Sequence, residues 1–90
     1  MVRERGPVEL HVYVEAGCST CRRAVDIARK VDGAYAGVAV RVIDTGRAEG
    51  IAADVFAVPT FVLDGKLLSL GNPREQDLQR AIEAALRPED

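Results

Sequence analysis

The spacing of apolar residues changes abruptly around Gly17, and this change constrains the fold more than any other feature of the chain. Along Val8–Val14 every second residue is apolar, which is the period of a strand with one buried face. Along Ser19–Val31 apolar residues recur every three or four positions, which is the period of an amphipathic helix. The chain is therefore predicted to pass from a strand through a short turn into a helix. Cys18 and Cys21 lie at that junction, with the cysteines at the N-terminus of the helix.

The middle of the chain continues the alternation of strands and helices. The segment Val38–Ile43 is dense in β-branched residues, as expected for a buried strand. Asp44 or the residue after it can cap a short helix that continues to about Val55. Two further apolar runs flank Asp64 and Gly65, which tolerate the positive φ angles of a two-residue type I′ turn. This pattern predicts a β-hairpin.

A final helix is predicted from its start signals. Asn72 can act as the N-cap, Pro73 suits the first turn, and Glu75 is placed as the acid of a capping box. The full order is β-α-β-α-β-β-α, which predicts an α/β fold with a four-stranded mixed sheet and helices on both faces. We expect one domain over residues 1–90, with its core between about 8 and 86. The apolar face of the final helix comprises Leu78, Ala81, Ile82, Ala85 and Leu86.

Composition and charge exclude several classes of function. The chain has 90 residues, a net charge of −2 and 4% aromatic residues, and its lysines and arginines are scattered, so binding to nucleic acid is disfavoured. No secretory signal is apparent, and no apolar stretch approaches the roughly 20 residues of a membrane span. We expect a cytoplasmic protein. In that reducing compartment structural disulfides are rare, and two cysteines cannot complete a four-cysteine zinc site. The pair is therefore expected to perform chemistry or to hold a soft metal.

Several features together resemble the thioredoxin/glutaredoxin superfamily. These are the pair Cys18 and Cys21 between the first strand and helix, the segment VPTF from Val58 at the head of the hairpin, the Asp-Gly turn and the closing helix. The resemblance covers Val8–Leu86. In size the chain is similar to the small, glutaredoxin-sized thioredoxin-like proteins of prokaryotes.

The resemblance implies a thiol–disulfide oxidoreductase. Cys18 would be the exposed nucleophile and Cys21 the deeper, resolving thiol, with the positive potential of the helix start favouring a thiolate at Cys18. Cys18 would attack a target disulfide, and Cys21 would then release the reduced target. The expected partners are a protein or low-molecular-weight disulfide and an upstream thiol reductase. No cofactor or metal is expected beyond the redox-active disulfide.

The resemblance also implies a second part of the site. The family's proline at the position of Pro59 is cis and lies against the cysteine pair, and the backbone beside it can pair with an extended substrate. The substrate surface is accordingly assigned to Val58, Pro59, Thr60, Ser19 and Thr20, and the hydroxyls of Ser19 and Thr20 are expected near the thiols.

The sequence departs from the family pattern at three places, and these departures affect the expected proton transfer and glutathione binding. The chain has no tryptophan beside the cysteines, where it carries Gly17, and Val12 occupies the place of the buried acid of thioredoxins. Proton transfer involving the resolving thiol therefore lacks its usual partner. The Gly-Gly-Asp region that holds glutathione in glutaredoxins is represented by Gly71, Asn72 and Pro73. Glutathione binding is unsupported by this sequence.

Two other functions remain open at this point. Heavy-metal-associated domains also place a Cys-x-x-Cys pair at a helix start, and two thiolates suit Cu(I) or zinc. Those domains carry methionine where this chain has Ala16, and they end in a strand rather than a helix. The other alternative is a thioredoxin-fold interaction module whose cysteines have no chemical role, or a thioredoxin-fold protein that shares an iron–sulfur cluster between two chains.

Overall fold

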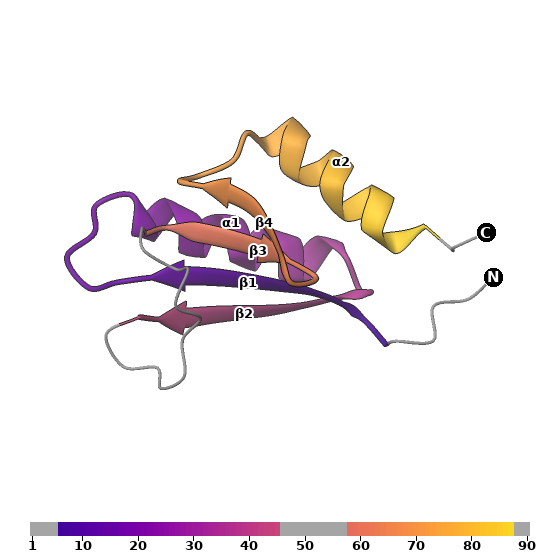
Figure 1. Ribbon diagram of the computed structural model, residues 1–90, viewed down its shortest axis with the longest axis horizontal. Coiled ribbons are helices and arrows are strands. Elements are labelled where there is room, and N and C mark those ends of the chain that lie inside the picture. Colours follow the sequence, from indigo (N-terminus) through magenta and orange to yellow (C-terminus); the bar gives the residue numbers. More distant parts are fainter. Residues whose placement is uncertain (1–5, 46–57, 88–90) are drawn as a thin grey trace.

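The computed structural model describes residues 6–45 and 58–87, which form four strands and two helices (Figure 1). The predicted strands and the first and last helices are all present. Most of the short helix predicted to end near Val55 lies outside the described residues. Asp44, proposed as its cap, instead ends a strand, because it continues the pairing with the neighbouring strand. The elements are β1 (Val8–Val14), α1 (Cys21–Ala34), β2 (Val38–Asp44), β3 (Thr60–Leu63), β4 (Lys66–Leu70) and α2 (Glu75–Leu86).

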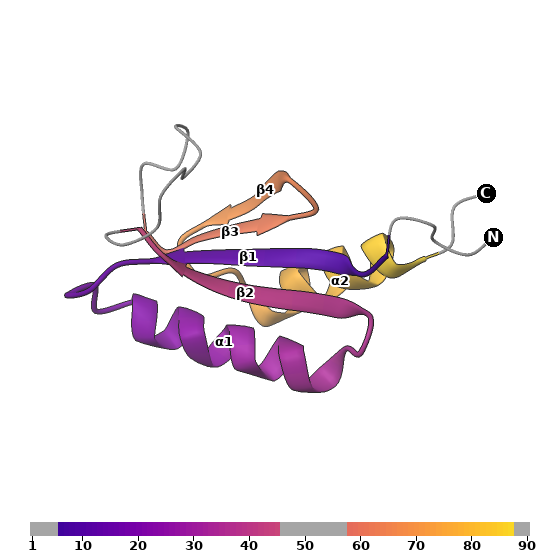
Figure 2. The ribbon, with the colours of Figure 1, turned by 90° about the horizontal axis from the view of Figure 1, so that it is seen from below.

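The four strands form one mixed sheet in the order β2-β1-β3-β4. β1 pairs in parallel with β2, so that Val8 lies opposite Val38, whereas β3 runs antiparallel to both β1 and β4. The parallel pair is possible because α1 crosses over between its two strands. This arrangement confirms the predicted four-stranded mixed sheet. It also brings the end of β1, the start of β3 and the start of α1 to the same part of the molecule (Figures 1 and 2).

Both described helices contribute to one hydrophobic core on one face of the sheet. Alternate residues of β1 are fully buried there, and Figure 2 shows α1 running below the strands. The predicted α/β class is confirmed, whereas the helix expected over the other face falls outside the described residues. Neither described helix is long and apolar enough to cross a membrane. The core comprises Val8, Leu10, Val12, Ala24, Ala28, Val31, Val38, Phe61, Leu78 and Ile82.

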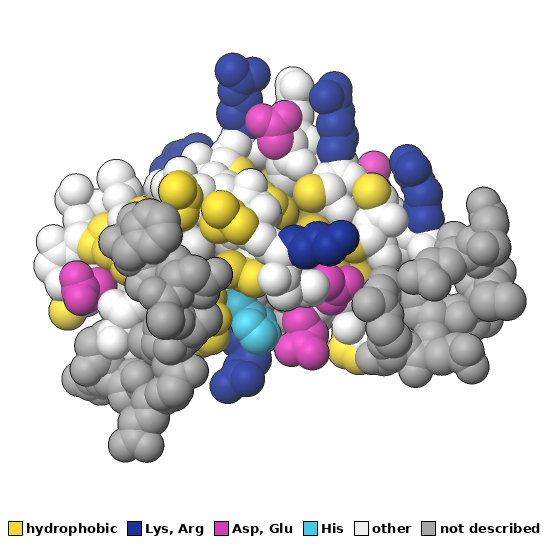
Figure 3. Space-filling view, in the orientation of Figure 1, with side chains coloured by type: hydrophobic (Ala, Val, Ile, Leu, Met, Phe, Trp, Pro, Cys, Tyr) yellow, Lys and Arg dark blue, Asp and Glu magenta, His cyan; other side chains and the backbone are white. Residues whose placement is uncertain are grey.

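The opposite face of the sheet mixes apolar and charged side chains. Figure 3 shows hydrophobic groups over the strands beside acidic and basic ones. Strand register places His11 and Val62 on this face, together with Leu67 of β4, of which 61% is exposed. His11 Nε2 lies 3.1 Å from Glu9 Oε1, so this histidine has a surface carboxylate as its partner. This pairing agrees with a structural role for His11.

Both helices begin later than the sequence predicts. α1 starts at Cys21 rather than Ser19, and Thr20 is its N-cap. α2 starts at Glu75, its N-cap is Arg74, and no side chain caps it, so the predicted capping box headed by Asn72 is wrong. The reason is tertiary, since the side chain of Asn72 donates its hydrogen bond to a carbonyl far away in the sequence. The acidic side chains in the first turn of α2 still interact favourably with the positive end of the helix dipole.

The hairpin turn provides a test of backbone conformation. Asp64 and Gly65 have φ angles of 50° and 82°, as predicted for a type I′ turn. A Cβ atom added at Gly65 would meet no atom within 4 Å, so only the backbone angle opposes a side chain there. Gly65→Ala is therefore expected to lower the free energy of unfolding by about 1 kcal/mol, as measured by urea denaturation.

Gly33 in α1 is the matched control for this substitution. A Cβ atom at Gly33 would also meet no atom within 4 Å, but its backbone is helical. Gly33→Ala is expected to raise the free energy of unfolding by about 0.5–1 kcal/mol, because alanine loses less backbone entropy in a helix. A change of the same sign in both variants would contradict this account of the turn.

Candidate active site

The two cysteines are held in a tight turn between β1 and α1. The amide of Cys18 donates to the carbonyl of Glu15 (3.3 Å), and the amide of Cys21 donates to the carbonyl of Cys18 (3.2 Å). The Cα atoms of the two cysteines are 5.3 Å apart, and their side chains form a disulfide. A separation of three residues with this turn thus places both sulfur atoms together, and it needs no movement of the backbone.

The two cysteines differ in burial. Cys18 lies in the turn before α1 and is half-buried, whereas Cys21 is the first residue of α1 and only 5% exposed. A reagent or a target disulfide can therefore approach Cys18, while Cys21 faces the core. This asymmetry is the arrangement expected for a nucleophile and a resolving thiol.

The hydroxyl of Thr20 lies beside the more accessible sulfur. Thr20 Oγ1 is 3.5 Å from Cys18 Sγ, and in the disulfide form only the hydroxyl has a proton to donate. Ser19, the other candidate from the sequence, is exposed and makes no such contact with a described residue. The structure thus brings one of the two predicted hydroxyls to the sulfur.

The proline segment has the predicted backbone conformation. The Val58–Pro59 peptide bond is cis, and Pro59 is buried. The carbonyl of Pro59 accepts a hydrogen bond of 2.7 Å from the amide of Gly71. Thr60 is 2% exposed and pairs with Tyr13 at the end of β1, so its side chain lies inside the protein rather than on the surface. The half-buried Val58 forms no hydrogen bond with residues 6–45 or 58–87.

Gly71 and Asn72 join the two parts of the site. The Gly71 amide binds Pro59, and the next side chain donates from Asn72 Nδ2 to the carbonyl of Thr20 at 3.1 Å. The sequence pattern predicts a helix cap at Asn72 and does not predict this contact. A signal was present, however, since the polar Asn72 follows a glycine directly after the last strand, in the region that the family uses for ligand contacts.

The start of α1 favours negative charge on sulfur. The first turn of α1 has no acidic residue, and the side chains of Arg22 and Arg23 are exposed beside it. The unpaired amides of a helix start attract an anion, so an acid there would offset part of that attraction. Val12 is fully buried at the position where thioredoxins carry an acid, and no charged side chain among the described residues is buried in the core.

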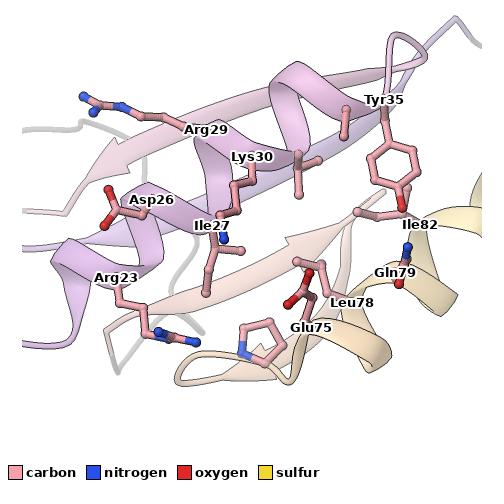
Figure 4. A pocket seen from close by; sticks show the side chains of 13 residues that line it. Arg23, Asp26, Ile27, Arg29, Lys30, Tyr35, Glu75, Leu78, Gln79 and Ile82 are labelled. Carbon is pink, nitrogen blue, oxygen red and sulfur yellow. The ribbon is translucent and has the colours of Figure 1, made fainter.

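A cavity among the described residues lies elsewhere, between α1 and α2. Its volume is about 550 Å³, and Figure 4 shows Ile27 of α1 and Leu78 of α2 pointing into the space between the helices. Lys30 and Glu75 place a positive and a negative group at its walls. None of the predicted site residues lines this cavity, which is a groove between the two helices. The groove is therefore separate from the cysteine pair.

Within residues 6–45 and 58–87, no three side chains of histidine, cysteine, aspartate or glutamate gather in a group that could hold a metal ion. The last described element is the helix α2, as the sequence predicts and unlike the strand that ends heavy-metal-associated domains.

The sheet order, the cysteine pair at the start of α1 and the cis proline before β3 define a thioredoxin-fold protein with a Cys-x-x-Cys disulfide. The family model described as thioredoxin domain matches residues 8–83. The chain therefore belongs to the thioredoxin family, as its sequence predicts.

Solved structures agree with this assignment. A thioredoxin from Fasciola hepatica shares 26% identity, with a TM-score of 0.72 over 88% of this chain and 81% of that chain. A mutant thioredoxin from Halobacterium salinarum has the same fold, with 24% identity and a TM-score of 0.79 over 96% of this chain and 80% of the other.

A third similar chain comes from a structure on the thiol resolving mechanism in yeast mitochondrial 1-Cys peroxiredoxin via glutathione/thioredoxin systems. It has 26% identity and a TM-score of 0.71, over 90% of this chain and 81% of that chain. A comparison with curated proteins gives no match.

Proposed function

We propose that the protein is a disulfide oxidoreductase in which Cys18 attacks and Cys21 resolves. The single observation that carries the proposal is the unequal burial of two disulfide-bonded cysteines at a helix start. An accessible sulfur can be reached by a target disulfide, and the buried sulfur can only be reached from within the protein. Two-step thiol–disulfide exchange requires one thiol that attacks the target and a second that resolves the mixed disulfide.

The reaction balances as two successive exchanges. The thiolate of Cys18 attacks one sulfur of the target disulfide, the bond between the target sulfurs breaks, and the other target sulfur leaves as a thiolate. The thiolate of Cys21 then attacks the sulfur of Cys18, the bond between Cys18 and the target breaks, and the second target sulfur leaves as a thiolate. Two electrons pass to the target, and the protein is left with the Cys18–Cys21 disulfide. An upstream thiol reductase in the cytoplasm would return the protein to its dithiol form.

The proline segment supports contact with an extended target. The Val58 backbone forms no hydrogen bond with the described residues, whereas the Pro59 carbonyl is already bound by Gly71. An extended chain beside Cys18 could therefore pair with Val58. Ser19 and Thr20 would line the same surface from the cysteine turn. The buried Thr60 would contribute through its backbone position and not through its hydroxyl.

The experiment tests whether the protein accelerates the reduction of insulin by dithiothreitol, and turbidity measures the progress of the reaction. We expect the protein to accelerate the reaction well above dithiothreitol alone, because the protein thiolate is positioned at a helix start. A redox titration of the cysteine pair then gives the direction, since a potential near about −270 mV suits a reductant and one near about −120 mV an oxidant. Metal analysis of the reduced protein is the companion measurement. No acceleration, together with one equivalent of copper or zinc bound by the two thiols, would replace this proposal by the metal-carrier function.

A further inference from the structure

We propose that Asn72 is a positioning residue for the nucleophile. Its side-chain amide holds Thr20 so that the Thr20 hydroxyl faces the sulfur of Cys18. The two contacts are Asn72 Nδ2 to the Thr20 carbonyl at 3.1 Å and Thr20 Oγ1 to Cys18 Sγ at 3.5 Å. The inference rests on the proposed function, because it assigns Cys18 as the attacking thiol.

Thr20 does not behave as an ordinary helix cap. A threonine at the N-cap usually has extended backbone angles and turns its hydroxyl to an amide in the first turn. Thr20 has φ −85° and ψ −12°, which is helical, and its side chain makes no cap hydrogen bond. The hydroxyl is directed to Cys18 instead. The need to cap α1 therefore does not explain the conformation of Thr20.

The contact from Asn72 provides an explanation. The Thr20 carbonyl accepts two hydrogen bonds, one from the amide of Ala24 at 3.2 Å and one from Asn72 Nδ2 at 3.1 Å. The first donor belongs to α1, and the second comes from the segment before α2, 52 residues away. The neighbouring Gly71 amide binds the Pro59 carbonyl at 2.7 Å. Two donors from separate parts of the chain thus fix the peptide group after Thr20. The dipeptide Gly71-Asn72, which supplies one of these donors, also binds the proline segment.

The other atom of the Asn72 amide limits how much this side chain adds to stability. Asn72 Oδ1 is buried and has no hydrogen-bond partner among the described residues. An unpaired buried acceptor opposes folding. Removing the whole side chain would remove both the favourable bond and the unpaired oxygen. We therefore expect a small net effect on unfolding and a larger effect on the sulfur.

The effect on the sulfur follows from its charge. In the reduced protein the thiolate of Cys18 is a stronger acceptor than a disulfide sulfur, and a hydroxyl that donates to it favours the charged form. If Thr20 is free to rotate, its hydroxyl can turn to water. Loss of the Asn72 contact would then lower the fraction of thiolate at neutral pH.

The test is the rate of alkylation of reduced protein by iodoacetamide as a function of pH. A Cys21→Ser background leaves Cys18 as the only thiol. Asn72→Ala and Thr20→Val are each expected to move the midpoint of the profile to higher pH. A rise of one unit lowers the rate below the midpoint by about threefold, because the loss of thiolate is partly offset by its greater nucleophilicity. Gln76→Ala is the control, since it removes an exposed amide side chain from the first turn of α2 and should leave the midpoint unchanged.

The double variant decides whether Asn72 acts through Thr20. In the Thr20→Val background, Asn72→Ala should produce no further shift of the midpoint. Equal shifts with and without the Thr20 hydroxyl would overturn the proposed route. An unchanged midpoint in the Thr20→Val protein would overturn the proposed route as well. Thr20 is exposed, so this result does not depend on whether the Asn72→Ala protein folds. An Asn72→Ala protein that fails to fold would also count against the proposal, because it would make the contact chiefly structural.

Alkylation requires no disulfide substrate, so this test is separate from the test of the proposed function. If the midpoints shift as expected but the protein does not reduce insulin, the oxidoreductase proposal fails and the role of Asn72 stands. If insulin is reduced but the midpoints of all variants agree, the role of Asn72 fails alone.

Discussion

A Cys18→Ser variant is expected to lose disulfide reduction to the background rate, while a Cys21→Ser variant accumulates a mixed disulfide with its target. Serine at position 18 removes the only sulfur that a target can reach, because Cys21 is 5% exposed at the start of α1. Serine at position 21 leaves the attacking sulfur in place but removes the thiol that completes the exchange. The two substitutions are isosteric, so they form a matched pair.

Mass spectrometry of acid-quenched and alkylated samples measures the trapped species. Each reduced variant is mixed with insulin, and the mass of the protein plus one insulin chain is expected only for Cys21→Ser. Equal trapping by both variants would contradict the assigned roles, and trapping by Cys18→Ser alone would reverse them. A separate turbidity assay on the unquenched variants should show no turnover for either.

Phe61→Ala is expected to cause the largest loss of stability of any single substitution considered for this chain. Phe61 lies at the centre of β3 and is fully buried. It pairs with Val12 on β1 and with Ser69 on β4, and it belongs to the core beneath the helices. Truncation leaves a cavity that close-packed neighbours fill only in part, which costs about 3–5 kcal/mol. Since a domain of this size is stable by about 5–15 kcal/mol, the variant would be close to unfolding at room temperature.

Urea denaturation monitored by circular dichroism measures this loss. Leu67→Ala is the control, because Leu67 lies on the neighbouring strand and is 61% exposed. Its free energy of unfolding should change by no more than about 0.5 kcal/mol. Similar losses in the two variants would mean that the core is not centred on β3, and the description of the fold would need revision.

Much of the fold follows from local patterns in the sequence. The period-2 run of β1, the β-branched run of β2 and the positive φ angles tolerated at Asp64 and Gly65 each depend on a few neighbouring residues. The same holds for the spacing of apolar residues in α1. These features were predictable because burial on one face repeats with the geometry of a strand or a helix. The cis peptide at Pro59 was predicted by resemblance and not by local pattern.

The helix starts could not be predicted to the same degree. Several residues around each start are competent caps, and the choice depends on which polar groups find partners elsewhere in the fold. Asn72 satisfies the sequence rule for a cap, yet its amide is used by Thr20. Thr20 in turn uses its hydroxyl at Cys18 rather than for α1. Each local rule was outcompeted by a contact between segments distant in the sequence or by the cysteine turn itself.

The sequence by itself determined the order of the elements, the face of each strand that enters the core, and the position of two thiols at the start of a helix. The family resemblance already implied that Cys18 is the exposed thiol. Only the tertiary structure decided which of two hydroxyls reaches its sulfur, and which distant side chain binds the carbonyl of Thr20. The physical reason is the range of the interactions. Periodicity is a property of neighbouring residues, whereas the link from Asn72 to Thr20 exists only after β3, β4 and α2 have packed beside the start of α1.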